Sequence, residues 1–104
     1  MELVYIVVPV FNEAPNIPTL FAGFRELEGE LSSRYRVEYV LVDDGSSDGT
    51  VAAARREAGP LPLTVLEHGH NRGPGAAFAT CFAYLAPRLS PQTNSPETIK
   101  RPAR

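Results

Sequence analysis

Residues 36–50 read RVEYVLVDDGSSDGT, and this stretch decides the fold class. Its first half is a run of β-branched, aromatic and other apolar residues, which is typical of a strand. Two carboxylates, a glycine and two serines then end the strand in a turn. A short helix is expected from Thr50 to Ala58, because Gly59 and Pro60 follow and stop it. The stretch is therefore a strand–turn–helix unit.

The same alternation extends along the rest of the chain. An apolar β-branched run that is suited to burial on both faces precedes the unit, and a shorter one follows it. The pattern predicts strands at Leu3–Pro9, Arg36–Asp43 and Leu63–Leu66, and helices at 16–33, Thr50–Ala58 and Ala76–Leu85. The last helix is hydrophobic nearly all round, so we expect it to be buried. Alternating strands and helices of these lengths predict a Rossmann-like α/β half-fold, a three-stranded parallel βαβαβα unit with right-handed crossovers.

The helix at 16–33 has the clearest periodicity. Asn16 is a candidate N-cap, and Pro18 is tolerated in the first turn. Apolar residues at steps of three and four form one face: Ile17, Leu20, Phe21, Phe24, Leu27 and Leu31.

Composition limits the function classes. The chain has 104 residues, is 43% hydrophobic and 21% charged, and carries a formal net charge of −2. These values fit one globular domain and give no electrostatic reason to expect nucleic-acid binding. A single cysteine, Cys81, excludes an internal disulfide framework and favours a reducing, cytoplasmic location. We expect its thiol to be a small buried hydrophobe rather than a nucleophile.

The two ends of the sequence differ in charge and composition. Residues 1–86 hold six basic and eleven acidic side chains, a net charge of −5, whereas residues 87–104 have a net charge of +3 and four prolines. We therefore predict a folded domain at 3–86 and a disordered basic tail at 87–104, and binding of the tail to a partner domain is the alternative. No signal peptide is expected, and the longest apolar stretch, Pro74–Pro87, is shorter than the roughly 20 residues that span a bilayer.

Ligands of parallel sheets bind beyond the carboxyl ends of the strands, which selects three loops: Val10–Pro15, Asp43–Gly49 and Glu67–Gly75. The first loop has no glycine, which excludes a dinucleotide-binding fingerprint. The only lysine, Lys100, lies in the tail, so a Walker loop is also excluded.

The second loop opens with two adjacent carboxylates, which repel one another unless something compensates. Asp43 and Asp44 point to opposite faces if the strand stays extended. One of them is then free to face a ligand while the other ties down a neighbouring loop. The alternative is that both only cap the turn and the helix that begins near Thr50.

The third loop and Phe11 also leave alternatives open. His68 and His70 suggest a metal, but a zinc site needs three or four ligands, so we do not favour one. The stretch Asn71–Gly75 is either a generic anion site at a helix start or an ordinary turn. Phe11 either stacks on a base or packs in the core.

Together the three loops resemble the start of a family 2 glycosyltransferase, most closely the dolichol-phosphate mannose synthase-like branch. The resemblance rests on three stretches in order, Val8–Ile17, Val42–Thr50 and Asn71–Ala77, and covers residues 3–86. It implies half of a nucleotide-diphospho-sugar transferase domain, a UDP- or GDP-sugar as ligand, and transfer of the sugar to an acceptor such as a polyprenyl phosphate or a polysaccharide.

The resemblance also assigns site residues. Phe11 stands where the family usually has tyrosine, Asp44 matches the carboxylate that receives the edge of uracil or guanine, and Asp43 matches its structural neighbour. The remaining matches lie in the first and third loops: Pro9, Glu13, Asn71, Arg72 and Gly73.

One family feature is missing from the sequence. The family holds Mg²⁺ or Mn²⁺ with an Asp-x-Asp on a fourth strand, whereas the only aspartates here are Asp43, Asp44 and Asp48. We therefore expect no catalytic residue and no metal held by this chain, which looks like a truncated domain that is inactive alone. The alternative is a non-catalytic nucleotide-binding or interaction module. An uncovered sheet edge would favour self-association.

Overall fold

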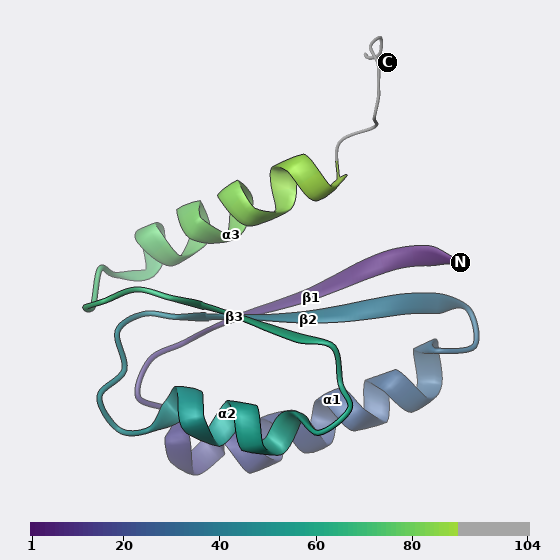
Figure 1. Cartoon of the computed structure of the whole chain (residues 1–104), viewed down its shortest axis with the longest axis horizontal. Helices are drawn as coiled ribbons and strands as arrows, with labels where there is room; N and C mark the ends of the chain where they lie inside the picture. Colours follow the sequence, from purple (N-terminus) through teal and green to yellow (C-terminus); the bar gives the residue numbers. More distant parts are fainter. Residues whose placement is uncertain (90–104) are drawn as a thin grey trace, which may run out of the picture.

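Three parallel strands end level with one another. The computed structural model of the protein describes residues 1–89 (Figure 1). The strands are β1 (Glu2–Val10), β2 (Tyr35–Asp43) and β3 (Leu63–Glu67), in the sheet order β1-β2-β3. The register pairs Val10 with Asp43, and Asp43 with Glu67, so the carboxyl ends form one row. The predicted three-stranded parallel sheet is confirmed.

Helices cover both faces of this sheet. Helices α1 and α2 lie on one face, and α3 lies on the other (Figure 1). The helical segments are the 3₁₀ turn η1 (Ala14–Asn16), α1 (Ile17–Leu31), α2 (Thr50–Ala58) and α3 (Pro74–Leu89). Helix α2 begins and ends at the predicted residues. Prolines occupy the first turns of η1 and α1, where a missing N–H costs no hydrogen bond.

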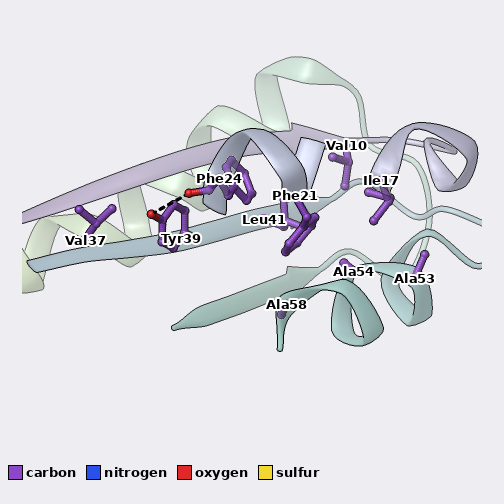
Figure 2. Packing of buried hydrophobic residues seen from close by; sticks show 10 residues of the cluster. All are labelled: Val10, Ile17, Phe21, Phe24, Val37, Tyr39, Leu41, Ala53, Ala54 and Ala58. Carbon is purple, nitrogen blue, oxygen red and sulfur yellow. Dashed lines mark hydrogen bonds between the residues drawn. The ribbon is translucent and has the colours of Figure 1, made fainter. Parts of the chain in front are cut away.

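The hydrophobic core lies between the sheet and helices α1 and α2 (Figure 2). Side chains at alternate positions of β2 point into it, as a period of two requires. The buried hydroxyl of Tyr39 donates to Oε1 of Glu28 at 2.8 Å and lies 3.4 Å from the carbonyl oxygen of Phe24. The cluster comprises Val10, Ile17, Phe21, Phe24, Val37, Tyr39, Leu41, Ala53, Ala54 and Ala58.

Strand β2 is buried on both faces, whereas β1 is not. Val37 and Leu41 lie under α1 and α2, and Val40 and Val42 are buried on the opposite side. Most of β1 is only half-buried, because β1 is an edge strand that pairs with β2 alone within residues 1–89. The expectation that Leu3–Pro9 is buried on both faces is therefore wrong.

Helix α3 differs most from its prediction. It begins two residues earlier and ends four residues later than Ala76–Leu85, and it continues through Pro87. Arg88 supports this last turn, since its guanidinium lies over the Tyr84 ring at 3.7 Å and donates to the Tyr84 carbonyl at 2.7 Å. Residues 87–89 of the predicted tail are thus helical, and the rest of that tail lies outside the described residues.

The expectation that α3 is buried is also wrong. Ala77 is its only buried residue, while Phe78 and Phe82 are 60% and 68% exposed. Apolar residues on all sides of this helix predict that every side is buried. Among residues 1–89, however, α3 packs against the sheet with one side only. Cys81 is half-buried, not buried as predicted.

Candidate functional site

The three loops selected from the sequence meet at the carboxyl ends of the strands. The backbone joins them directly, because Asp44 N donates to the Val10 carbonyl at 2.9 Å and His68 N donates to the Asp43 carbonyl at 2.8 Å. These bonds continue the sheet one residue beyond its last paired row. The loops are therefore held at fixed positions by the strands that precede them.

Asn12 ties the first loop to the second. Its backbone N–H donates to Oγ of Ser46 at 2.8 Å, and its side-chain Oδ1 accepts from the Ser47 N–H at 2.9 Å. Asn12 has a φ of 51°, a left-handed conformation that asparagine tolerates better than most residues. No role was predicted for Asn12, although asparagine is among the loop residues that tolerate a left-handed conformation.

Asp48 and Thr50 make the second tie between these loops. Glu13 N donates to Oγ1 of Thr50 at 2.9 Å, and Ala14 N donates to Oδ2 of Asp48 at 3.1 Å. The Thr50 hydroxyl and backbone N–H both donate to Oδ1 of Asp48. These bonds, above all the one from the Thr50 side chain, hold the pKa of Asp48 below its ordinary value. Asp48 is thus committed to supporting the loop.

Asp43 and Asp44 have different roles. Asp43 is buried and caps the turn, since its Oδ2 accepts from the Ser46 N–H at 3.1 Å. Its Oδ1 is buried and has no hydrogen-bond partner among residues 1–89. Asp44 instead ties down the third loop. Of the two interpretations of this pair, capping describes Asp43, and anchoring of a neighbouring loop describes Asp44.

Each oxygen of the Asp44 carboxylate has two protein donors. Oδ1 lies 2.7 Å from Nδ1 of His68 and accepts from the Arg72 N–H at 2.8 Å. Oδ2 accepts from Nδ2 of Asn71 at 3.1 Å and from the Gly73 N–H at 2.9 Å. These bonds, led by the one to His68, hold the pKa of Asp44 below its ordinary value.

The stretch Asn71–Gly75 is therefore an anion site whose anion is Asp44 itself. A carboxylate offers about four acceptor positions, and all four are used here. Two of the donors are backbone N–H groups just before α3, the geometry that favours negative charge at a helix start.

Gly45 lets the second and third loops come this close. Its φ of +82° belongs to the left-handed region. A Cβ at this position would lie within 3.0 Å of backbone atoms of His70 and Asn71. Only glycine meets both conditions without displacing the third loop.

The two histidines, His68 and His70, differ in burial and do not form one site. His68 is 7% exposed, and both of its ring nitrogens have partners, with Nε2 lying 2.7 Å from Oγ1 of Thr80 in α3. His70 is exposed. The polar bridge through His68 was not predicted, because the His-x-His pattern suggests only a metal ligand.

A hollow of about 180 Å³ opens beside Asp44. Phe11 stands at its rim and is 44% exposed, so the ring is not a core residue and has a free surface for stacking. The lining comes from the end of β1, the first and second loops and the start of α3: Pro9, Val10, Phe11, Asp44, Pro74 and Ala77.

Glu13 lies in a second hollow of about 200 Å³ that shares Pro9 and Val10 with the first. This hollow is completed by residues of α1, so the two hollows flank the end of β1. Oε1 of Glu13 accepts from Nδ2 of Asn16 at 2.7 Å. Asn16 occupies the N-cap position of α1, as predicted, but its side chain makes no capping hydrogen bond within residues 1–89.

The structure thus separates the predicted site residues into groups. Pro9, Phe11 and Asp44 line one hollow, and Asn71, Arg72 and Gly73 hold Asp44 in place. Glu13 lines the adjacent hollow, and Asp43 is enclosed by its own turn.

The described residues do not fit a divalent cation. Within residues 1–89, no group of three or more histidines, cysteines, aspartates or glutamates is placed to hold one. All acceptor positions of the Asp44 carboxylate bind donors of the third loop, and both oxygens of Asp48 accept hydrogen bonds from the first loop and Thr50. No metal-assisted step is derived from these side chains.

Comparison with known proteins places the chain in a family. The family model described as Glycosyl transferase family 2 matches residues 5–86. An undecaprenyl-phosphate 4-deoxy-4-formamido-L-arabinose transferase of Pseudomonas fluorescens is 35% identical over 112 aligned residues, which cover 97% of this chain and 31% of that protein. A dodecaprenyl-phosphate galacturonate synthase of Rhizobium johnstonii is 39% identical over 75 residues, which cover 70% and 22%.

A solved structure agrees with these sequences. A mannosyltransferase from Pyrobaculum calidifontis, solved in complex with GDP-Man and Mn²⁺, superposes with a TM-score of 0.58 at 34% identity and covers 78% of this chain and 24% of that one. The chain spans about a third or less of the length of these relatives. It belongs to glycosyl transferase family 2.

Proposed function

We propose that this chain binds the nucleotide of a UDP- or GDP-sugar in the hollow beside Phe11 and Asp44. The observation that carries the proposal is the position of a half-exposed aromatic ring over a hollow at the carboxyl ends of parallel strands. The related transferases are named for polyprenyl-phosphate acceptors, and the mannosyltransferase neighbour was solved with GDP-Man. A polyprenyl phosphate, or a polysaccharide, is accordingly the proposed acceptor for the whole transferase.

In this proposal Phe11 supplies the stacking surface and Pro9 the apolar wall. The predicted role of Asp44, which is to accept from the edge of the base, requires one of its four protein donors to be released. Asn71 is itself exposed, which makes it the side-chain donor that can be exchanged. Loss of a neutral donor to a carboxylate is then balanced by the N–H of uracil or guanine.

We further propose that the 104 residues alone transfer no sugar. The leaving diphosphate develops charge that a divalent cation stabilises by several kcal/mol in metal-assisted transfer, and the described residues offer no ligand set for one. A missing general base costs a further factor of roughly 10²–10⁴ in rate.

The single cysteine supports a cytoplasmic location for this part of the transferase. None of the described helices combines the length and hydropathy that crossing a bilayer requires.

Isothermal titration calorimetry tests the proposal. We expect the full 104-residue chain to bind UDP or GDP weakly, and Phe11→Ala to weaken this binding about tenfold, since stacking on one aromatic ring contributes roughly 1–3 kcal/mol. Leu27→Ala is the control, because Leu27 is also an exposed large hydrophobic residue but lies on α1 outside the hollow. Equal affinities for the two variants would contradict the placement of the base. Metal-dependent turnover by the 104-residue chain would contradict the proposed inactivity.

A second candidate function, an interaction module, has its own observation. The outer edge of β1 pairs with no strand among residues 1–89, and Phe78 and Phe82 are exposed on the helix that covers its face. Unpaired edges favour pairing with another chain. We propose self-association through this edge, and sedimentation equilibrium tests it: Phe82→Glu should shift the protein toward monomer, whereas a wild-type monomer at all concentrations would rule it out.

A further inference from the structure

We infer that His68 is a positioning residue of the nucleotide hollow, which it serves by fixing the carboxylate of Asp44. The inference rests on the proposed function, because it assigns His68 to the same site. His68 does not line the hollow itself. Its side chain is 3% exposed and lies behind Asp44, between the end of β3 and α3.

The two ring nitrogens of His68 have different partners. Nδ1 lies 2.7 Å from Oδ1 of Asp44, and because a carboxylate that accepts four hydrogen bonds only accepts, Nδ1 carries a proton. Nε2 lies 2.7 Å from Oγ1 of Thr80. The Thr80 hydroxyl donates to Nε2 in the neutral ring and accepts from it in the charged ring, so either state keeps the bridge intact.

The bridge determines where Asp44 presents its other oxygen. Oδ1 is held from behind by His68, which orients Oδ2 toward Asn71 and the Gly73 N–H. Without the Nδ1 donor, Oδ1 would keep only the Arg72 N–H, and the three remaining donors would all come from residues 71–73, the stretch that the carboxylate anchors. Asp44 also lines the hollow, so a shift of its carboxylate changes the hollow directly.

The Thr80 contact holds the imidazole ring but not the carboxylate. Helix α3 has only one buried side chain, Ala77, so apolar packing anchors it weakly to the sheet. The buried chain Asp44–His68–Thr80 is a polar link between the end of β2 and this helix. The link therefore has two separable parts, one that serves the site and one that serves the docking of α3.

Two amide variants separate these parts. The side-chain amide of asparagine reaches the position of Nδ1, whereas that of glutamine reaches the position of Nε2. His68→Asn thus keeps the donor to Asp44 and loses Thr80, and His68→Gln does the reverse. Thr80→Val removes the same contact as His68→Asn while leaving the imidazole in place. All three variants are made in the full 104-residue chain, and thermal unfolding followed by circular dichroism reports their folding.

The first readout needs no ligand. Amide hydrogen exchange at Arg72 and Gly73 reports whether their N–H groups still donate to Asp44. We expect His68→Asn and Thr80→Val to keep the wild-type protection and His68→Gln to lose about tenfold, which is the effect of losing one charge-assisted hydrogen bond. If His68→Gln does not fold, His68→Asn decides alone: lost protection at both amides in a folded protein overturns the inference.

The second readout is the affinity for UDP and GDP by calorimetry. We expect it to follow the same order, with His68→Asn within about threefold of wild type and His68→Gln about tenfold weaker. Equal losses for these two variants would mean that His68 serves stability alone and would overturn the inference. If wild type binds neither nucleotide, the proposed function fails, and the amide readout still decides whether His68 positions Asp44.

Discussion

Replacement of Gly45 by alanine should separate backbone strain from steric overlap. Gly45 and Gly49 lie in the same turn with nearly equal φ angles, +82° and +87°. A Cβ at Gly45 would overlap the backbone of His70 and Asn71, whereas a Cβ at Gly49 has nothing within 4 Å. The two alanine variants therefore share the conformational cost, and only one of them adds an overlap.

The magnitudes follow from these two costs. A left-handed conformation costs a non-glycine residue about 1–2 kcal/mol, which is the expected destabilisation by Gly49→Ala. Overpacking against a fixed backbone adds about 1–3 kcal/mol, so Gly45→Ala should lose about 2–5 kcal/mol. The excess for Gly45→Ala over Gly49→Ala is the quantity that the reasoning predicts.

Urea unfolding monitored by circular dichroism measures both losses. The m-value should stay at the wild-type value, since the surface that unfolding exposes is unchanged. If Gly45→Ala unfolds the chain without urea, a titration with a stabilising osmolyte restores a measurable transition for all three proteins. Equal free energies of unfolding for the two variants would refute the claim that the close approach of the third loop requires Gly45.

Other predictions concern single contacts and pH. Tyr39→Phe should lower the free energy of unfolding by about 1 kcal/mol, because it removes the buried hydrogen bond to Glu28, and thermal unfolding checks this. Since the folded pKa values of Asp44 and Asp48 lie below their ordinary values, their contribution to stability is complete above about pH 4 and is lost as the pH falls through the folded pKa values. Asp48→Asn should therefore make the urea midpoint fall less steeply with acid than in wild type, and an unchanged slope would contradict this.

Local patterns predicted the elements of this fold well because they report periodicity. The strand ending at Asp43 and the helix from Thr50 to Ala58 have the right period and strong stop signals, and both occur as expected. The position of the site followed from topology alone, since parallel strands bring their carboxyl ends to one edge. Pro87 predicts the start of the tail, but one missing N–H does not end a helix when the next side chain packs back on it.

Partners across the fold were harder to predict because they depend on register and distance. Nothing local to Asp44 indicates that a histidine 24 residues later would bond its Oδ1, or that it would fill the anion site that Asn71–Gly75 suggested. The exposure of Phe78 was missed for a similar reason. Hydrophobic residues on all sides of a helix predict that the helix is buried, but only the tertiary structure shows which of its sides are in contact with other elements.

The internal pairing of Asp44 with the third loop also affects how a charged ligand approaches. Backbone N–H groups ahead of a helix usually attract anions, but here a carboxylate already neutralises them. Arg72 is then the loop's only permanent cation on a domain whose residues 1–86 carry −5. A diphosphate therefore meets a repulsive long-range field, and added salt, by shortening the Debye length to about 8 Å at 0.15 M, should speed its association. The net charge of the domain thus slows the approach of an anionic ligand to this site, where a positive domain would speed it.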